Sequence, residues 1–243
     1  MVPLSFAGQE FEIVAPAALF WPAQRAILVA DLHLEKASFY ARQGQMLPPY
    51  DSQATIDELA QIIVQTNART VFCLGDNYHD NGGETRLESH AAKQLQYLTE
   101  TVDWVWITGN HDPDVTGQWG GRILPQWTGC GIALRHEATI NPDLPELSGH
   151  YHPKIRVKVR NRHVSRRCFV VGSRNLILPA FGALTGGMAA NDPVIEAVIG
   201  DPAEAVICLS KNLLRFPLGF RKIQSIENVQ TELPLFEDFA SVK

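Results

Sequence analysis

Long apolar segments are missing from this chain of 243 residues. The most apolar early segment, residues 15–30, is broken by Pro16, Pro22, Gln24 and Arg25. A helix that crosses a membrane needs about 20 consecutive apolar residues, so we expect no membrane span. The amino-terminal sequence MVPLSFAGQE also lacks the basic start of a secretion signal. Together these absences predict a cytoplasmic protein.

Closely spaced cysteines are also absent. The four cysteines, Cys73, Cys130, Cys168 and Cys208, lie far apart in the sequence and form no Cys-x-x-Cys pair. Such pairs are typical of structural zinc sites, and dense cysteines are typical of small secreted chains with disulfides. We therefore expect reduced thiols, most of them buried.

Acidic residues are absent from residues 154–167, which hold seven of the chain's 21 lysines and arginines. Because the net charge of the chain is −5, this segment predicts a local anion-binding surface on an otherwise acidic protein. Two interpretations stay open. The charges protect an exposed edge strand from aggregation, or Lys154, Arg156 and Lys158 bind the phosphates of a substrate.

Apolar periodicity predicts alternating strands and helices in the first half of the chain. Residues 26–31, 70–75 and 103–109 are short apolar runs that end in aspartate or glycine, which indicates buried strands. Two amphipathic helices are expected between them. Their apolar stripes are Ile56, Leu59, Ala60, Ile63 and Val64 in the first and Leu87, Ala91, Leu95 and Leu98 in the second. Asp51 and Ser52 are candidates for the amino-terminal cap of the first helix.

The pattern changes near residue 131. The sequences GIALRH, KIRVKV, CFVV, NLILPAF and AVICLS predict strands with short connections and little helix. We expect a second sheet, built largely from the carboxyl-terminal half of the chain.

Six of the eight histidines belong to a series of short polar motifs. In chain order the series is Asp31-Leu-His33, Gly75-Asp76-Asn-Tyr-His79-Asp80, Gly109-Asn110-His111-Asp112, the single His136, and Gly149-His150-Tyr-His152. Carboxylate, amide and imidazole groups without thiolates favour Mn, Fe, Zn or Mg.

The spacing of these motifs predicts how the side chains meet. Residues i and i+2 of an extended segment point to the same side. Asp31 and His33 are therefore expected to bind one ion together, and His150 and His152 to reach two ions across a narrow cleft. Asp76, with two oxygens, is able to bridge two ions. The glycines before the ligands allow sharp turns of the backbone.

The order of these motifs over residues 31–152 resembles the calcineurin-like metallophosphoesterase superfamily. Within it, DLHLEKAS, GDNYHD, GHYHP and LILPAFGALTGGM resemble the bacterial DNA-ligase-associated metallophosphoesterases. The resemblance implies a four-layer α/β/β/α sandwich of two mixed sheets, as one domain over residues 1–226. Residues 227–243 are expected to form a carboxyl-terminal tail.

The resemblance also implies a role for each motif. The first metal would be held by Asp31, His33, Asp76 and His152, and the second by Asp76, Asn110, His136 and His150. His136 is the least secure ligand, because a single histidine is more often a packed or surface residue.

His111 resembles the family's general acid. His79 is the second catalytic candidate. It stands where phosphoprotein phosphatases carry an aspartate that orients the catalytic histidine and where double-strand-break nucleases carry a histidine, which favours phosphodiester or nucleic-acid substrates. Asp80 and Asp112 are candidates for the residues that orient the metal ligands through hydrogen bonds.

The function implied is that of a phosphodiesterase dependent on two metal ions, with manganese expected and Zn, Fe or Mg as alternatives. It would be a nuclease in DNA repair, beside a ligase and a helicase. The tail sequence around Leu233, Leu235 and Phe236 resembles the peptide by which bacterial repair proteins bind the sliding clamp. Two alternatives stay open: a phosphoesterase of small molecules or nucleotides, and a non-catalytic interaction scaffold. The intact motifs argue against the scaffold.

Overall fold

The computed structural model describes residues 1–159, 162–200, 202–209 and 212–219. The predicted tail, residues 227–243, and the clamp-binding peptide within it lie outside the described residues. No helix in the described ranges is long and apolar enough to cross a membrane.

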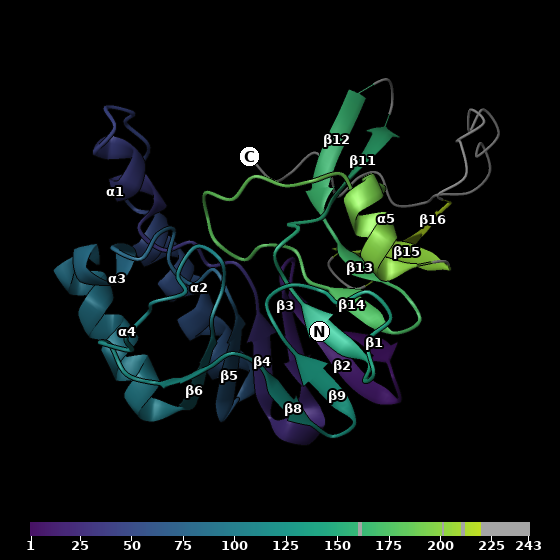
Figure 1. The fold of residues 1–243 in the computed structure, drawn as a ribbon, viewed down its shortest axis with the longest axis horizontal. Helices are drawn as coiled ribbons and strands as arrows, with labels where there is room; N and C mark the ends of the chain where they lie inside the picture. The colour runs from purple at the N-terminus through teal and green to yellow at the C-terminus, as the bar shows by residue number, and fades with distance from the viewer. Residues whose placement is uncertain (160–161, 201, 210–211, 220–243) are drawn as a thin grey trace.

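Two seven-stranded sheets form the body of the molecule (Figure 1). The first has the strand order β1-β2-β3-β4-β5-β6-β7. Neighbours are antiparallel from β1 to β4 and parallel from β4 to β7, so the sheet is mixed. Its strands are β1 (Val2–Phe6), β2 (Gln9–Ala15), β3 (Ala18–Trp21), β4 (Ala26–Val29), β5 (Thr70–Leu74), β6 (Asp103–Ile107) and β7 (Arg122–Leu124).

The second sheet has the order β16-β15-β13-β14-β10-β9-β8. It is also mixed, because β14, β10 and β9 run parallel and the other neighbours antiparallel. Its strands are β8 (Trp127–Gly129), β9 (Ile132–Leu134), β10 (Glu146–Ser148), β13 (Phe169–Val171), β14 (Asn175–Ile177), β15 (Ala203–Leu209) and β16 (Asn212–Leu218). A separate hairpin pairs β11 (Lys154–Val159) with β12 (Arg162–Arg167).

Helices cover the outer faces of both sheets. On the first sheet α2 and α4 pack over β4, β5 and β6. On the second, α5 packs against β13, β14 and β15. The helices are α1 (Lys36–Ala41), α2 (Asp51–Thr66), α3 (Gly83–Arg86), α4 (Ser89–Thr101) and α5 (Pro193–Ile199), with a 3₁₀ turn, η1 (Pro22–Gln24). The predicted four-layer α/β/β/α sandwich is confirmed.

Alternation along β4 explains why the predicted strands are apolar throughout. Ile27 and Val29 enter the core under α2 and α4, whereas Ala26 and Leu28 enter the core between the sheets. A strand covered on both faces buries every side chain. The same holds for residues 71–74 of β5 and residues 104–107 of β6. The three predicted strands lie side by side at the centre of the first sheet.

Three details of the predicted helices are wrong. Val64 is 83% exposed, and Ile62 takes its place in the buried stripe of α2. Leu87 is buried but precedes α4. Asp51 and Ser52 do not cap α2, because their side chains accept hydrogen bonds from the backbone of the preceding segment, at Ala37 and Glu35.

Candidate metal centre

The polar motifs meet at the carboxyl ends of parallel strands from both sheets. Asp31, Asp76 and Asn110 follow β4, β5 and β6, and His136 and His150 follow β9 and β10. Parallel neighbours end at the same edge of a sheet, which is where α/β folds place their binding sites. The two sheets therefore contribute to one site at one end of the sandwich.

The backbone of five of the seven candidate ligands is left-handed rather than extended. Asp31, His33, Asp76, His150 and His152 have φ values of 54°, 44°, 48°, 74° and 48°. The extended pairs expected from i, i+2 spacing are therefore wrong, although the side chains still converge. Non-glycine residues rarely hold this conformation.

Hydrogen bonds between neighbouring loops hold this strained backbone. Asp31 N donates to Gly75 O at 3.1 Å and His33 N donates to Asp76 O at 2.9 Å. His150 N donates to both carboxylate oxygens of Asp31, at 3.0 and 2.9 Å.

The glycines before the ligands, Gly75, Gly109 and Gly149, allow neighbouring loops to approach closely more than they allow sharp turns. A Cβ atom at Gly109 would lie 2.1 Å from Asp76 N, and one at Gly149 would lie 2.6 Å from Asp31 Oδ2. Among these three glycines before the ligands, only Gly75 combines close approach, 2.3 Å to His136 Nδ1, with a positive φ of 80°. The loops that carry the ligands are packed too tightly for any side chain at these positions.

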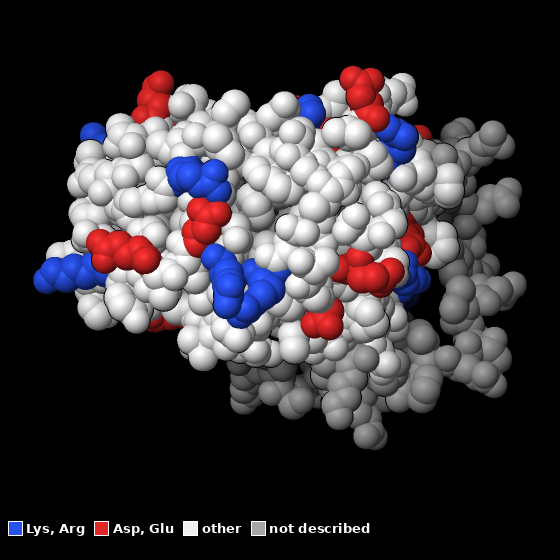
Figure 2. Space-filling view, turned by 90° about the horizontal axis from the view of Figure 1, so that it is seen from below, with Lys and Arg blue, Asp and Glu red and all other residues white. Residues whose placement is uncertain are grey.

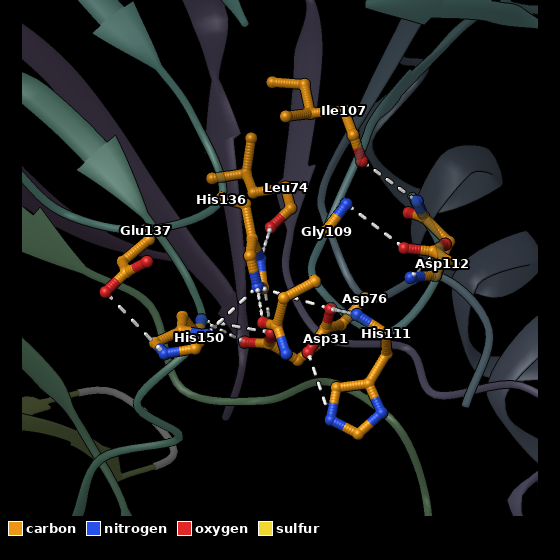
Figure 3. Close-up of polar contacts among 12 residues, drawn as sticks. Asp31, Leu74, Asp76, Ile107, Gly109, His111, Asp112, His136, Glu137 and His150 are labelled. Carbon is orange, nitrogen blue, oxygen red and sulfur yellow. Dashed lines mark hydrogen bonds and ion pairs between the residues drawn. The ribbon is translucent and has the colours of Figure 1, made fainter. Parts of the chain in front are cut away.

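The structure brings together all seven residues that the sequence assigns to metal binding (Figure 3 shows part of the cluster). In each of two groups, the possible ligand atoms lie within 4.8 Å of one another. The first group is Asp31, His33, Asp76 and His152, and the second is Asp76, His136 and His150. Asn110 joins the second group, because its Oδ1 lies 2.8 Å from His136 Nε2. Asp76 belongs to both groups.

The spacing of the imidazoles fits bound cations. His33 Nε2 lies 3.2 Å from His152 Nε2, and His150 Nδ1 lies 3.1 Å from His136 Nε2. Two nitrogens that each sit about 2.1 Å from one ion lie about 3.0 to 3.4 Å apart. Burial, followed by repulsion from His152, lowers the pKa of His33 to about 2. The neutral imidazole that a cation requires is therefore present near neutral pH.

The second nitrogen of three candidate ligands faces another polar group. His136 Nδ1 lies 3.0 Å from Leu74 O, which accepts its proton, and His33 Nδ1 lies 3.4 Å from His79 Nδ1. His150 Nε2 lies 3.9 Å from Glu137 Oε1 (Figure 3). Such outer contacts fix the orientation of metal-binding histidines. Glu137 was missed from the sequence, where its position next to His136 was the only signal.

His111 lies at the exposed side of the two groups. Its side chain is 39% exposed, its Nδ1 donates to His79 O at 2.8 Å, and its Nε2 lies 3.9 Å from Asp76 Oδ2. Its backbone N donates to Asp76 Oδ1 at 3.0 Å. With Nδ1 engaged, Nε2 is the nitrogen that faces the site.

His79 touches both His33 and His111. Its ring packs against the rings of both, with centroids 5.4 and 5.2 Å away, and its carbonyl accepts the hydrogen bond from His111 Nδ1. Phe39 and Tyr40 pack against the ring, with centroids 4.8 and 5.5 Å away. Burial, then the charge of Lys36, lowers the pKa of His79 to about 4. The His79 side chain therefore contacts both the candidate acid His111 and the candidate metal ligand His33.

The two aspartates expected to support the ligands differ. Buried Asp112 accepts hydrogen bonds from the backbone N–H groups of Asn77, Tyr78 and Gly109, at 2.9, 3.2 and 3.1 Å. It ties the loop after β5 to the loop after β6, and burial raises its pKa to about 6. Asp80 instead forms a two-oxygen ion pair with Arg86, so the structure places it against α3 rather than against a ligand.

The basic residues of the sequence begin two positions after His152. Lys154, Arg156 and Lys158 alternate along β11. Opposite Lys154, on β12, the Arg167 guanidinium donates to Phe181 O, Gly182 O and Thr185 Oγ1, at 3.1, 2.6 and 3.0 Å. Arg167 thus has a structural role, because it holds the backbone of the segment 181–185.

Comparisons with solved structures found a nuclease. The chain is 27% identical to the Pseudomonas putida nuclease MPE, covers 89% of its own length and 98% of that chain, and superposes with a TM-score of 0.69. A phosphoesterase from E. coli is 15% identical, with 82% and 96% covered and a TM-score of 0.38. A predicted phosphoesterase from Streptococcus pneumoniae is 15% identical, with 79% and 96% covered and a TM-score of 0.32. No curated protein matches the chain.

A family comparison covers the motifs themselves. The calcineurin-like phosphoesterase family matches residues 25–168, which is more than half of the chain and includes every motif from Asp31 to His152. The chain therefore belongs to the calcineurin-like phosphoesterase family and is a metal-dependent phosphoric ester hydrolase.

Proposed function

We propose that this hydrolase cleaves phosphodiesters in DNA with two divalent cations. The observation that carries the proposal is the membership of Asp76 in both ligand groups, which puts two cation sites next to each other. Bound there, the cations would supply charge neutralisation at the phosphate and an activated water.

The residues of the chain have separate tasks in this reaction. Asp31 and Asp76 supply negative charge, and Asn110 supplies a neutral oxygen that limits it. His111, with its Nδ1 proton on His79 O, holds a second proton at Nε2 and gives it to the leaving oxygen. His79 is a positioning residue, because its ring orients His33 and its carbonyl orients His111.

Similarity to a nuclease supports a nucleic acid as the substrate, since the Pseudomonas putida protein is 27% identical over nearly its whole length. DNA is the proposed nucleic acid because of the resemblance to the DNA-ligase-associated metallophosphoesterases. A phosphoesterase of small molecules or nucleotides is the second candidate, because the ligand groups alone select phosphate and not what is attached to it. The complete ligand set argues against a non-catalytic scaffold.

Manganese is the proposed native cation, as the resemblance to the DNA-ligase-associated metallophosphoesterases implies, and the oxygen and imidazole donors also suit Zn, Fe or Mg. A role in DNA repair, beside a ligase and a helicase in the cytoplasm, belongs to the same proposal. So does a sliding-clamp contact through the tail.

The experiment is a matrix of cations and substrates: Mn, Mg, Zn and Fe against DNA and bis-p-nitrophenyl phosphate. Cleavage of DNA with one of these cations is expected. Hydrolysis of the small diester without any cleavage of DNA would favour the second candidate.

Variants separate chemistry from metal binding. His111→Ala should keep bound metal and lose about 10²- to 10⁴-fold in turnover, the usual contribution of a general acid. Asp76→Ala should lose metal and turnover together. His90→Ala, at an exposed position of α4, is the matched control. Wild-type turnover in His111→Ala would overturn the assignment of the acid.

A further inference from the structure

The β11–β12 hairpin has two different faces. Residues that pair directly across two antiparallel strands lie on the same face. The register pairs Lys154 with Arg167, Arg156 with Ser165 and Lys158 with His163. One face therefore carries a row of basic side chains. The opposite face carries Ile155, Val157 and Val164 together with Arg162 and Arg166.

The basic face is turned towards the candidate metal centre. Arg167 and Lys154 both reach the segment 181–185: Arg167 donates to Gly182 O at 2.6 Å, and Lys154 Nζ donates to Thr185 O at 3.4 Å. Gly182 N in turn donates to the backbone O of Asp31 at 3.2 Å. The base of the hairpin, at Arg167, is thus connected to the candidate ligand Asp31 through two hydrogen bonds.

The outer part of this face carries charge without a partner. Arg156 and Lys158 are exposed, and within the described residues neither makes a hydrogen bond or an ion pair. Successive strand residues rise by about 3.3 Å, so the row from Lys154 to Lys158 extends about 13 Å outward. Figure 1 shows the hairpin projecting from the two sheets.

The underside of the molecule offers a contrast. Figure 2 shows basic side chains there lying beside acidic ones on a mostly uncharged surface. Segment 154–167, by comparison, contains no acidic residue. A row of positively charged side chains that starts beside a phosphoesterase centre is complementary to a linear polyanion with regularly spaced negative charges.

We propose that the face of the hairpin formed by Lys154, Arg156 and Lys158 binds the phosphate backbone of a nucleic acid strand and guides it to the metal centre. This rests on the proposed function and extends it from the reacting phosphate to the phosphates beside it. Contacts of this kind position a strand without reading its sequence.

The test removes two charges from one face. In the double variant Arg156→Ala, Lys158→Ala, binding of a labelled DNA oligonucleotide should weaken about tenfold or more. The slope of log affinity against log salt should fall by about 1.4 to 1.8, because each lost phosphate contact removes about 0.7 to 0.9. Fluorescence anisotropy measures both quantities on the full chain, loaded with Mn²⁺ and carrying His111→Ala to slow cleavage. In otherwise wild-type enzyme, KM for DNA should rise while kcat stays the same.

Arg162→Ala is the matched control, since Arg162 is an exposed arginine on the other face of the hairpin. Unchanged binding in the double variant, equal weakening by Arg162→Ala, or no DNA binding by the parent protein would each overturn the proposal. Hydrolysis of bis-p-nitrophenyl phosphate should be unaffected by the double variant, because a small diester does not reach the hairpin. If the parent protein binds DNA but hydrolyses no diester, the proposed function fails and the hairpin proposal does not.

Discussion

Individual residues at this site are held in conformations that they would not adopt alone. Five candidate ligands have positive φ, a state that costs about 1 to 3 kcal/mol for a non-glycine residue. Each is kept there by contacts between loops that come from different strands. The site is therefore sensitive to small changes in how the loops approach one another.

Gly109→Ala tests this sensitivity. The added methyl group would lie 2.1 Å from Asp76 N and 2.2 Å from Asp76 Oδ1, so the bridging carboxylate has to move. We expect the free energy of unfolding to fall by about 1 to 3 kcal/mol, as for overpacked cores, together with loss of bound metal. Urea titration and metal analysis measure the two effects. The control is Gly186→Ala, where a Cβ meets nothing within 4 Å, and an equal effect there would contradict the explanation.

Glu137→Gln tests the outer contact of His150. Removing the negative charge next to Nε2 should weaken the second of two metal-binding events about tenfold, in the usual range for such partners, and leave the first unchanged. Titration calorimetry with Mn²⁺ separates the two events. Glu100→Gln, on the exposed surface of α4, is the control. Equal weakening of both events would show that Glu137 acts through the net charge of the site alone.

The sequence predicted which side chains meet at the site but not how the backbone presents them. Asp31, Asp76 and Asn110 end neighbouring parallel strands, so their convergence followed from the strand pattern. The left-handed ligands could not be foreseen, because they depend on hydrogen bonds between loops far apart in the sequence. Glu137 is one acidic residue among many on the surface, and only its distance from His150 distinguishes it.

At the scale of elements, side chains near the ends of α2 have partners or exposure that the local sequence pattern does not predict. Asp51 and Ser52 begin α2, where capping is the usual role, yet they hold the amino-terminal end of α1 instead. Val64 fitted an apolar stripe, but the phase of α2 is set by the core that contains Ile62. The strands β4, β5 and β6 were predictable because both of their faces are buried. The first strands, β1 to β3, were not predicted.

The loop after β14 depends on one arginine. Arg167→Lys keeps the charge but loses the planar fork that contacts Phe181, Gly182 and Thr185. We expect hydrogen exchange of residues 180–189 to accelerate and the unfolding free energy to fall by about 1 to 3 kcal/mol. Arg162→Lys on the same strand serves as control. Unchanged exchange in the 180–189 segment would mean that other contacts hold this loop.

At the scale of the whole molecule, the cations are expected to stabilise the fold. Asp31 and Asp76 are almost fully buried, at 0% and 2% exposure, and their carboxylates lie among the imidazoles of the site. A ligand present at 100 times its Kd stabilises the native state by about 2.7 kcal/mol. For a chain of this size, that raises Tm by about 5 to 10 °C.

Thermal unfolding with Mn²⁺ and with EDTA measures this difference. The Asp76→Ala variant should show the same Tm in both conditions, because its shared ligand is gone. A wild-type Tm that does not change on removal of metal would contradict the expected stabilisation.

The segment 180–189 joins the two stretches of chain that supply the first ligand group. Phe181 N and Gly182 N bind the backbone of Ala30 and Asp31, and Met188 N binds His152 O. The first group also joins residues 119 positions apart, His33 and His152. During synthesis on the ribosome, we therefore expect this group to be complete only after residue 152 has emerged, and the contacts that hold it only after residue 188. Metal uptake would then report that both sheets have docked.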